Sequence, residues 1–294
     1  MTNFGKLMTA MVTPFKADLS VDYAMAEKLA NYLVDHGSET IVVHGTTGES
    51  PTLTHEEEYE LYRVVKKAVG ARCKIIAGTG SNSTATTIKS SKEAEKIGVD
   101  GLMIVVPYYN KPSQEGMFQH YSAVAKSTSL PIIIYNIPGR CGVNMQPETV
   151  ARIAKENKNV IGLKDAAGNV DQTAATKKLV PSSFTIWSGD DNLTLPMMKV
   201  GAVGVISVVS HIVGKEIAQM IAAYDSGDVK KAEELHNKLM PVFSVMFITA
   251  NPTPLKAALE MIGMPCGKLR LPLIEANASE KEQIKAVLKD LKLV

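Results

Sequence analysis

The sequence predicts an α/β protein: a (β/α)8 (TIM) barrel over residues 1–226, followed by a small C-terminal helical domain over residues 227–294. Charged amphipathic segments alternate with short β-branched runs through most of the chain, as in repeated strand–helix units. The short runs are apolar almost throughout, which is typical of parallel strands buried on both faces. Eight such runs, in units of about 25 residues, favour a closed barrel over a doubly wound sheet.

The eight strands are expected at residues 7–12, 40–44, 74–77, 102–106, 132–136, 160–164, 184–187 and 204–209. Helix signals lie between them. Thr54 and Glu57 have the spacing of a capping box, in which each side chain bonds the other residue's amide. Gly37, Gly70 and Gly98 follow helical stretches and are expected to end them in the left-handed conformation.

Beyond residue 226 the pattern indicates helices only, near residues 229–240, 242–261 and 279–291. Pro252 and Pro254 are expected to break the second of these, because proline lacks an amide hydrogen and clashes with the preceding turn. No low-complexity linker precedes these segments, so the helical domain is expected to pack on the barrel.

Composition excludes several classes of protein. Hydrophobic residues make up 45% and charged residues 21%, which is typical of a folded chain. A net charge of +2 predicts no general affinity for nucleic acid or anionic membranes. Cys73, Cys141 and Cys266 are too far apart for a Cys-x-x-Cys site, which disfavours a disulfide framework or a thiolate metal centre. With no signal-peptide pattern at the start and no uninterrupted apolar span, we expect a cytoplasmic protein.

In such barrels the active site lies at the C-terminal ends of the strands. Lys164 ends the sixth expected strand, next to Gly162, whose missing side chain would leave room. Tyr135 ends the fifth strand and shares its inward parity. A buried lysine has a pKa below its ordinary value of about 10.4, and the resulting amine can attack a ketone. The alternative is that Lys164 extends into solvent or pairs with Asp165.

Other strand ends carry groups that could bind a small acid. The loop Gly45-Thr46-Thr47-Gly48-Glu49 offers two hydroxyls and several amides to a carboxylate, although it could be an ordinary turn. Arg140 has the planar fork that binds carboxylates, unless it is a plain surface arginine. Gly78-Thr79-Gly80 lacks the third glycine of a dinucleotide site, and the six histidines have no metal-binding spacing.

Five motifs in order resemble the dihydrodipicolinate synthase / N-acetylneuraminate lyase family of pyruvate-dependent aldolases, over almost the whole chain. They are Gly45-Thr46-Thr47-Gly48-Glu49-Ser50, Pro107-Tyr108-Tyr109-Asn110-Lys111-Pro112-Ser113-Gln114-Glu115-Gly116, Tyr135-Asn136-Ile137-Pro138-Gly139-Arg140, Gly162-Leu163-Lys164-Asp165-Ala166-Ala167-Gly168-Asn169 and Ser188-Gly189-Asp190-Asp191. The resemblance implies condensation of pyruvate with aspartate β-semialdehyde, in lysine and diaminopimelate biosynthesis.

The resemblance also implies roles for individual residues. Lys164 would form the imine, and Tyr135 would relay protons with Thr46 and Tyr109. Because the imine itself withdraws electrons, no metal or organic cofactor is expected. The substrate-binding residues would be Thr47 for the pyruvate carboxylate, Arg140 for the carboxylate of the aldehyde, and Gly189 and Ile206 through their backbone carbonyls. Members of the family are commonly homotetramers, dimers of dimers, in which the residue matching Tyr109 enters the neighbouring subunit's site.

Family members inhibited by lysine resemble this chain at Ser50, His55, Asn82 and Tyr108. They differ at two further positions, where they carry a histidine and a glutamate and this chain has Glu58 and Thr86. Losing the carboxylate at position 86 should weaken the binding of an ammonium group. Weak or lost lysine inhibition is therefore expected.

Two other functions stay open. One is an aldolase of the same family that cleaves a sugar acid, either N-acetylneuraminate or 2-keto-3-deoxygluconate. The other is a non-catalytic barrel that binds 2-oxo acids as a sensor. Arg140 and the paired threonines favour a short dicarboxylate-like product over a polyhydroxylated sugar acid.

Overall fold

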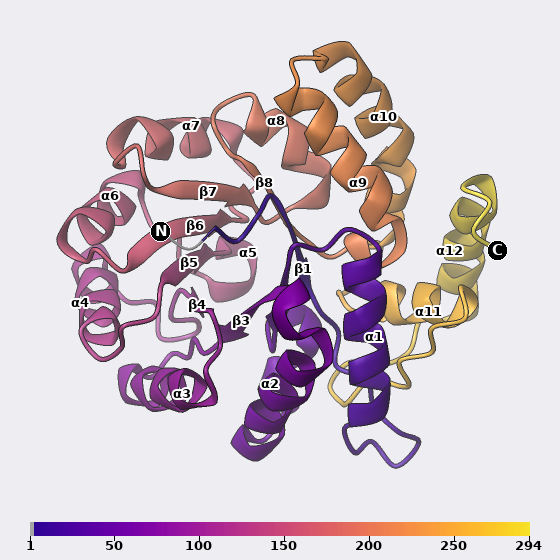
Figure 1. The fold of residues 1–294 in the computed structure, drawn as a ribbon, viewed down its shortest axis with the longest axis horizontal. Coiled ribbons are helices and arrows are strands. Elements are labelled where there is room, and N and C mark those ends of the chain that lie inside the picture. The colour runs from indigo at the N-terminus through magenta and orange to yellow at the C-terminus, as the bar shows by residue number, and fades with distance from the viewer. Residues whose placement is uncertain (1–2) are drawn as a thin grey trace. The chain divides into compact units, whose positions relative to one another are not determined.

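The computed structural model describes residues 3–294, and its eight strands form one closed parallel barrel in the order β1 to β8 (Figure 1). The strands are β1 (Leu7–Ala10), β2 (Thr40–Val43), β3 (Lys74–Gly78), β4 (Gly101–Val105), β5 (Ile132–Asn136), β6 (Val160–Asp165), β7 (Thr185–Ser188) and β8 (Gly204–Ser207). The sequence prediction of a (β/α)8 barrel is therefore confirmed, with every strand at its expected place.

Helices follow the strands in the expected alternation. They are α1 (Tyr23–Asp35), α2 (His55–Val69), α3 (Thr84–Ile97), α4 (Gln114–Ala125), α5 (Pro138–Cys141), α6 (Pro147–Glu156), α7 (Val170–Leu179), α8 (Thr194–Met198), α9 (Ser210–Asp225), α10 (Val229–Val245), α11 (Thr253–Met261) and α12 (Ala278–Asp290). The capping box of Thr54 and Glu57 is confirmed at the start of α2.

The three glycines expected to end helices behave differently. Gly98 ends α3 in the left-handed conformation, with φ 84° and ψ 35°. Gly37 follows α1 with a positive φ of 100°. The prediction is wrong for Gly70, whose φ of 55° is combined with a ψ of −130°, outside the left-handed region. Here the chain turns directly into a short 3-10 helix, Gly70–Arg72, which leads to β3.

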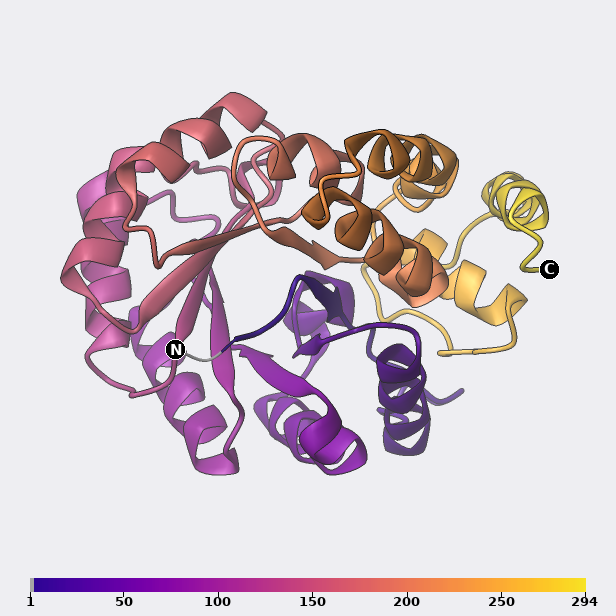
Figure 2. The same cartoon turned by 45° about the horizontal axis from the view of Figure 1, so that its top comes forward.

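The chain forms two compact units, and one of them comprises Ile75–Ile206 with the N-terminal residues up to Lys6. Within it β4 to β7 pair in parallel, and Tyr135 on β5 is in register with Lys164 on β6. The helices α3, α4, α6 and α7 lie along the outer side of these strands, as the tilted view in Figure 2 also shows. The polar ends of neighbouring strands are thus aligned at one edge.

The other unit comprises Leu7–Lys74 and Ser207–Val294. In it β1 pairs with β2, α1 packs on α2, and α9 contacts both β1 and α1. The C-terminal helices join this unit, because α10 packs on α9 and α12 packs on α10 and α11. The domain boundary between residues 226 and 227 stays a prediction.

The C-terminal helices differ from the sequence prediction at Pro241. The ranges expected for the first two helices left Pro241 between them, but α10 continues through it to Val245. The break expected at Pro252 and Pro254 is confirmed, because Pro252 precedes α11 and Pro254 lies in its first turn. Pro241 removes one hydrogen bond from the helix. The apolar side chains that follow, among them Val242 and Phe243, are almost fully buried, and this packing keeps the last turn helical.

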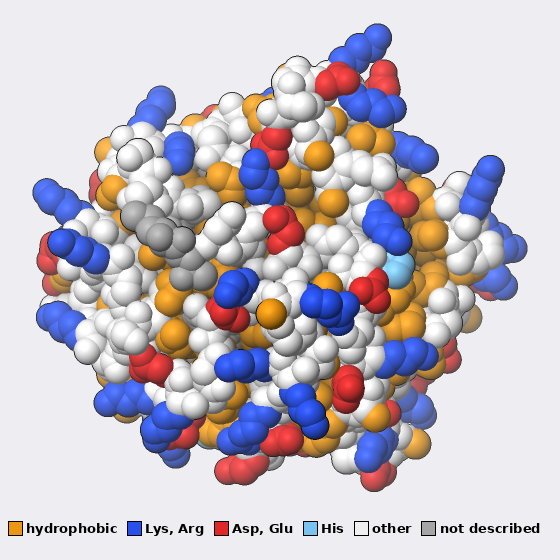
Figure 3. Space-filling view, viewed as in Figure 1, with side chains coloured by type: hydrophobic (Ala, Val, Ile, Leu, Met, Phe, Trp, Pro, Cys, Tyr) orange, Lys and Arg blue, Asp and Glu red, His pale blue; other side chains and the backbone are white. Residues whose placement is uncertain are grey.

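The surface fits a chain with no strong charge bias. Basic and acidic side chains are interspersed over the face in Figure 3. Over residues 3–294, no helix has the length and apolar character required to cross a membrane.

Candidate active site

Lys164 lies near the end of β6, between two aromatic residues on the neighbouring strands. Its register partners are Tyr135 on β5 and Trp187 on β7. The ammonium nitrogen Nζ lies 4.2 Å from the centroid of the Tyr135 ring. Lys164 and Tyr135 are each only 4% exposed. The side chain therefore does not extend into solvent, and the register of β5 and β6 agrees with the shared inward parity expected for Lys164 and Tyr135.

Burial changes the protonation of Lys164. Loss of hydration lowers the pKa of its ammonium group from 10.5 to about 8, and the repulsion of Arg140 acts in the same direction. The carboxylates of Asp190 and Asp191 oppose this shift by attracting the cation. A pKa near 8 leaves roughly a tenth of the lysine as free amine at pH 7. The group can therefore act as a nucleophile towards a carbonyl carbon.

The Asp165 carboxylate accepts its hydrogen bonds from groups other than Lys164. It accepts a hydrogen bond from the Thr173 hydroxyl at 2.8 Å and another from the Ala167 amide at 3.1 Å. It is fully buried, and burial raises the pKa of its carboxyl group. Asp165 thus fixes the chain after β6 and so holds the backbone of Lys164 in place.

Gly162 does not leave room for the lysine, contrary to the sequence prediction. A Cβ atom at this position would lie 2.6 Å from the Trp187 ring and 2.6 Å from the Thr185 carbonyl oxygen. The space is filled by the neighbouring strand β7. A glycine is needed here because Trp187 packs directly on the β6 backbone.

The chain after β7 carries Asp190, whose carboxylate attracts the Lys164 ammonium group. The Gly189 amide donates to the Asp165 carbonyl at 2.7 Å, and a Cβ at Gly189 would lie 2.6 Å from Cβ of Ala166. The Ser188 hydroxyl donates to the Asp190 carbonyl and accepts from the Asp190 amide. Burial raises the pKa of Asp190 to about 6, although the charge of Lys164 opposes this rise. Ile206, on β8, is fully buried.

Arg140 and Tyr109 are the exposed members of the predicted set. Arg140 lies in the short helix α5 after β5. Tyr109 is 86% exposed and has a φ of 73°, which is unusual for a residue with a side chain. Its amide donates to the Cys141 carbonyl at 3.3 Å, so the backbone of Tyr109 is tied to the end of α5. The aromatic ring itself projects from the chain.

The predicted carboxylate loop belongs to the other compact unit. It forms two 3-10 turns, Thr46–Gly48 and Ser50–Thr52, joined by Glu49 in the left-handed conformation. Thr47 is 2% exposed, and its hydroxyl oxygen accepts a hydrogen bond from Asn251 Nδ2 at 3.0 Å. A side-chain hydrogen bond from outside the loop therefore helps to hold its conformation.

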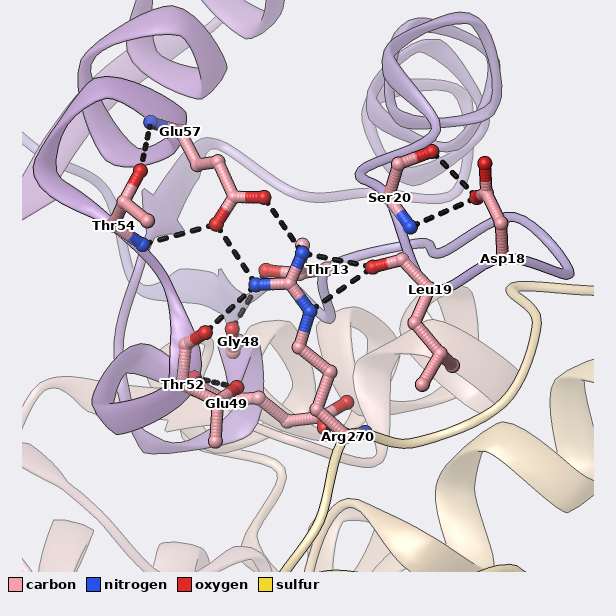
Figure 4. A network of polar contacts seen from close by, with 10 residues as sticks. All are labelled: Thr13, Asp18, Leu19, Ser20, Gly48, Glu49, Thr52, Thr54, Glu57 and Arg270. Atoms are coloured by element: carbon pink, nitrogen blue, oxygen red, sulfur yellow. Dashed lines mark hydrogen bonds and ion pairs between the residues drawn. The ribbon is translucent and has the colours of Figure 1, made fainter.

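The C-terminal segment holds Glu49 from two sides. Lys256 Nζ lies 2.7 Å from Glu49 Oε1, with 2% and 0% of the two side chains exposed. The Arg270 amide donates to Glu49 Oε2 at 3.0 Å, while its guanidinium bonds the Glu57 carboxylate and the carbonyls of Leu19 and Thr52 (Figure 4). Sequence reasoning missed these contacts; the only signal was a lysine, Lys256, within an apolar helix.

The four positions at which the chain resembles lysine-inhibited family members divide between the two units. Ser50 and His55 lie in one, Asn82 and Tyr108 in the other. Glu58 bridges two histidines: its carboxylate oxygens lie 3.0 Å from His44 Nε2 and 2.9 Å from His55 Nδ1. Burial raises the pKa of Glu58, but the hydrogen bonds from the histidines outweigh it and hold the pKa below 4.5. The group is therefore a charged carboxylate at neutral pH.

One unit contains most of the predicted site residues, and the other contains the two threonines. The first contains Lys164, Tyr135, Tyr109, Arg140, Gly189 and Ile206, and the second contains Thr46 and Thr47. Over residues 3–294, no cluster of three or more His, Cys, Asp or Glu side chains could hold a metal ion.

Comparisons with known proteins point in one direction. The model of the Dihydrodipicolinate synthetase family matches residues 3–291. The 4-hydroxy-tetrahydrodipicolinate synthase of Moorella thermoacetica is 56% identical over 291 residues, covering 99% of both chains. The enzyme of the same name from Cyanothece sp. is 52% identical over 295 residues, with 100% of both covered. The crystal structure of the Cyanidioschyzon merolae enzyme with lysine bound superimposes with a TM-score of 0.98 at 47% identity, covering 99% of both chains.

Proposed function

The chain belongs to the dihydrodipicolinate synthetase family, and we propose that it condenses pyruvate with aspartate β-semialdehyde to give 4-hydroxy-tetrahydrodipicolinate. The observation that carries this proposal is Lys164, a buried lysine with a pKa of about 8 beside Tyr135. The name shared by the relatives favours this reaction over cleavage of a sugar acid. The reaction supplies lysine and diaminopimelate biosynthesis, and we assign the enzyme to the cytoplasm.

Lys164 performs covalent catalysis. Its neutral amine attacks the ketone carbon of pyruvate, and loss of water from the resulting adduct gives a protonated imine. The imine withdraws electrons, so the pyruvate methyl group releases a proton and becomes an enamine. The enamine carbon then attacks the aldehyde carbon of the second substrate, and the aldehyde oxygen takes up a proton. Attack by the substrate's own amino group on the imine carbon closes the ring and releases Lys164.

The proton transfers need a group that can both give and accept a proton close to Lys164. Tyr135 has its ring beside the lysine nitrogen and little exposure to water. We assign the relay to Tyr135, with Thr46 and Tyr109 as its hydroxyl partners. Such a chain moves protons without admitting bulk water to the enamine.

Each of the two substrates carries a carboxylate group that the site has to bind. We assign the pyruvate carboxylate to Thr47 and the exposed carboxylate of the semialdehyde to Arg140, whose planar fork suits a bidentate contact. Gly189 and Ile206 contribute backbone carbonyls, which accept hydrogen bonds from the substrates. These assignments rest on the family motifs and on the position of each residue in or shortly after a barrel strand, Ile206 being the one that lies within its strand.

The exposure of Tyr109 supports the proposal of an oligomer. A tyrosine that is 86% exposed on a backbone with positive φ is held in a strained position, and such strain is common where a residue serves a function. We propose that Tyr109 enters the site of a neighbouring subunit in a homotetramer built from two dimers. Mixing inactive Tyr109→Phe and Lys164→Ala chains tests this, because a mixed dimer regains one complete site. Failure to recover activity would refute the exchange of Tyr109.

Regulation by lysine should be weak or absent. Glu58 already engages Nδ1 of His55 at 2.9 Å, so this nitrogen would have to leave the carboxylate before it could bind an added ligand. Position 86 is a threonine, so no carboxylate is available there for the ligand's ammonium group. Sensitivity to lysine below the millimolar range in a steady-state titration would refute this proposal.

A substrate comparison tests the proposed reaction. Purified protein is supplied with pyruvate and aspartate β-semialdehyde, and separately with N-acetylneuraminate and 2-keto-3-deoxygluconate. Rapid condensation with negligible sugar-acid cleavage is expected, and the reverse would favour the alternative aldolase. Lys164→Ala separates both from a sensor, since a sensor lacking this lysine would still bind pyruvate non-covalently.

A further inference from the structure

Asn251 is a buried amide that contacts the loop assigned to the pyruvate carboxylate. It lies just before α11 and is 5% exposed. Its Nδ2 donates to the Thr47 hydroxyl oxygen at 3.0 Å, and its Oδ1 has no hydrogen-bond partner within residues 3–294. The two residues are 204 positions apart in the chain, so the contact depends on tertiary structure. No motif in the sequence pointed to Asn251.

The chemistry of a hydroxyl group gives this contact a direction. A threonine hydroxyl carries one hydrogen and two acceptor sites, whereas an amide nitrogen can only donate. When Asn251 donates to Thr47, the threonine oxygen acts as acceptor in that bond. Its own hydrogen is then free to point elsewhere, and a carboxylate accepts such a hydrogen well.

Hydrogen bonds of neighbouring residues hold the chain on both sides of the Asn251–Thr47 contact. Downstream of it, the Thr253 hydroxyl donates to the Ile274 carbonyl at 3.0 Å, and Lys256 donates to the Lys268 carbonyl at 2.8 Å. On the loop side, the Thr13 hydroxyl donates to the Gly48 carbonyl at 2.6 Å, next to Thr47. Both partners of the Asn251–Thr47 bond are therefore held by their own neighbours.

We propose that Asn251 is a positioning residue that directs the Thr47 hydroxyl as a hydrogen-bond donor towards the pyruvate carboxylate. The proposal deepens the proposed function and rests on it. Its effect should appear in the pyruvate dependence of imine formation and leave the semialdehyde dependence nearly unchanged, because the bond acts before the second substrate enters.

Asn251→Asp reverses the direction of the bond at nearly constant shape. The carboxylate accepts only, so the Thr47 hydrogen turns towards position 251, away from the ligand, and a negative charge is added nearby. The half-saturating pyruvate concentration for imine formation, trapped with borohydride, should rise by at least roughly tenfold. Asn251→Ala lets the hydroxyl rotate freely and should raise it by roughly threefold. A residue that matters only for packing would give the opposite order, with alanine worse than the isosteric aspartate.

A matched control is available in Asn157. Its Nδ2 donates to the Ser122 hydroxyl at 3.1 Å, and the residue is 7% exposed, but it follows α6 and is outside the assigned site. Asn157→Asp should alter thermal stability and leave the pyruvate dependence unchanged. If Asn251→Asp does not fold, Asn251→Ala is compared with and without Thr47→Val. Removal of the hydroxyl should then abolish the effect of Asn251→Ala.

The outcomes separate the two proposals. Absence of a trapped adduct in the wild-type protein would overturn the proposed function. A trapped adduct whose pyruvate dependence is the same in wild type and Asn251→Asp would overturn the role of Asn251 alone. An Asn251→Ala effect that persists without the Thr47 hydroxyl would also overturn that role.

Discussion

Substitution of Lys256 by methionine should destabilise the protein strongly. The substitution keeps an unbranched apolar stem, in a side chain one atom shorter than that of lysine, and removes the charge next to Glu49. In the native structure Nζ lies 2.7 Å from Glu49 Oε1, and the two side chains are 2% and 0% exposed. Nζ also donates to the Lys268 carbonyl and lies 4.3 Å from the centroid of the Phe15 ring.

The size of the destabilisation follows from the Glu49 carboxylate that stays buried after Lys256 is replaced. Glu49 would be a buried carboxylate whose main compensation is the Arg270 amide. Removing one partner of a buried ion pair costs about 3–5 kcal/mol, because the other charge stays uncompensated. In a domain of 150–250 residues, 1 kcal/mol shifts the melting temperature by about 2–4 °C. Lys256→Met should therefore lower the melting temperature by on the order of 10 °C.

Thermal denaturation of matched variants measures this effect. The control is Lys231→Met, which breaks the pair with Glu234 at 3.5 Å, where both side chains are 54% exposed. Such a surface pair contributes less than about 1 kcal/mol. The double variant Glu49→Gln with Lys256→Met should be more stable than Lys256→Met alone, since no charge is left buried. Equal melting temperatures for Lys256→Met and Lys231→Met would refute the stabilising role of the buried pair.

Three further outcomes are expected. Imine formation should accelerate with rising pH, reach half of its maximum near pH 8 and level off above it. Asp190→Asn should move this profile to lower pH, because the carboxylate raises the pKa of Lys164; an unchanged profile would count against that interaction. His211 is fully buried with a pKa of about 4, against an ordinary 6.5, so the unfolded chain binds its proton first and stability falls as pH drops from about 6.5 to 4. Urea denaturation of His211→Gln should show a weaker decline over this window, and an identical decline would refute the assignment. Gly189→Ala would place a Cβ 2.6 Å from Ala166, so imine trapping should slow and stability should fall by about 1–3 kcal/mol; normal values for both would contradict the tight contact of β7 with the end of β6.

The sequence predicts the barrel well because each strand can be recognised from its own residues. A buried parallel strand must be apolar along its length, and the runs around Ile132 and Val160 satisfy this without reference to the rest of the chain. The prediction failed where tertiary packing overrides a local signal. Pro241 should end a helix, but burial of the following apolar residues carries α10 beyond it.

The candidate site was predictable where a residue ends a strand. Lys164 and Tyr135 could be paired from the parity of two adjacent strands, and the register agrees. Contacts between segments distant in sequence were not predictable. Asn251 and Thr47 are separated by 204 residues, and Arg270 and Glu49 by 221. The role wrongly given to Gly162 has the same cause, since Trp187 on another strand fills the space.

The measurement that tests the central claim most directly is identification of the residue that forms the imine. The protein is incubated with pyruvate, reduced with borohydride and digested, and the modified peptide is sequenced by mass spectrometry. We expect a single adduct on Lys164, formed faster as the pH rises towards 8 and absent from Lys164→Ala. An adduct on any other lysine, or none in the wild-type protein, would contradict the assignment of Lys164 as the nucleophile.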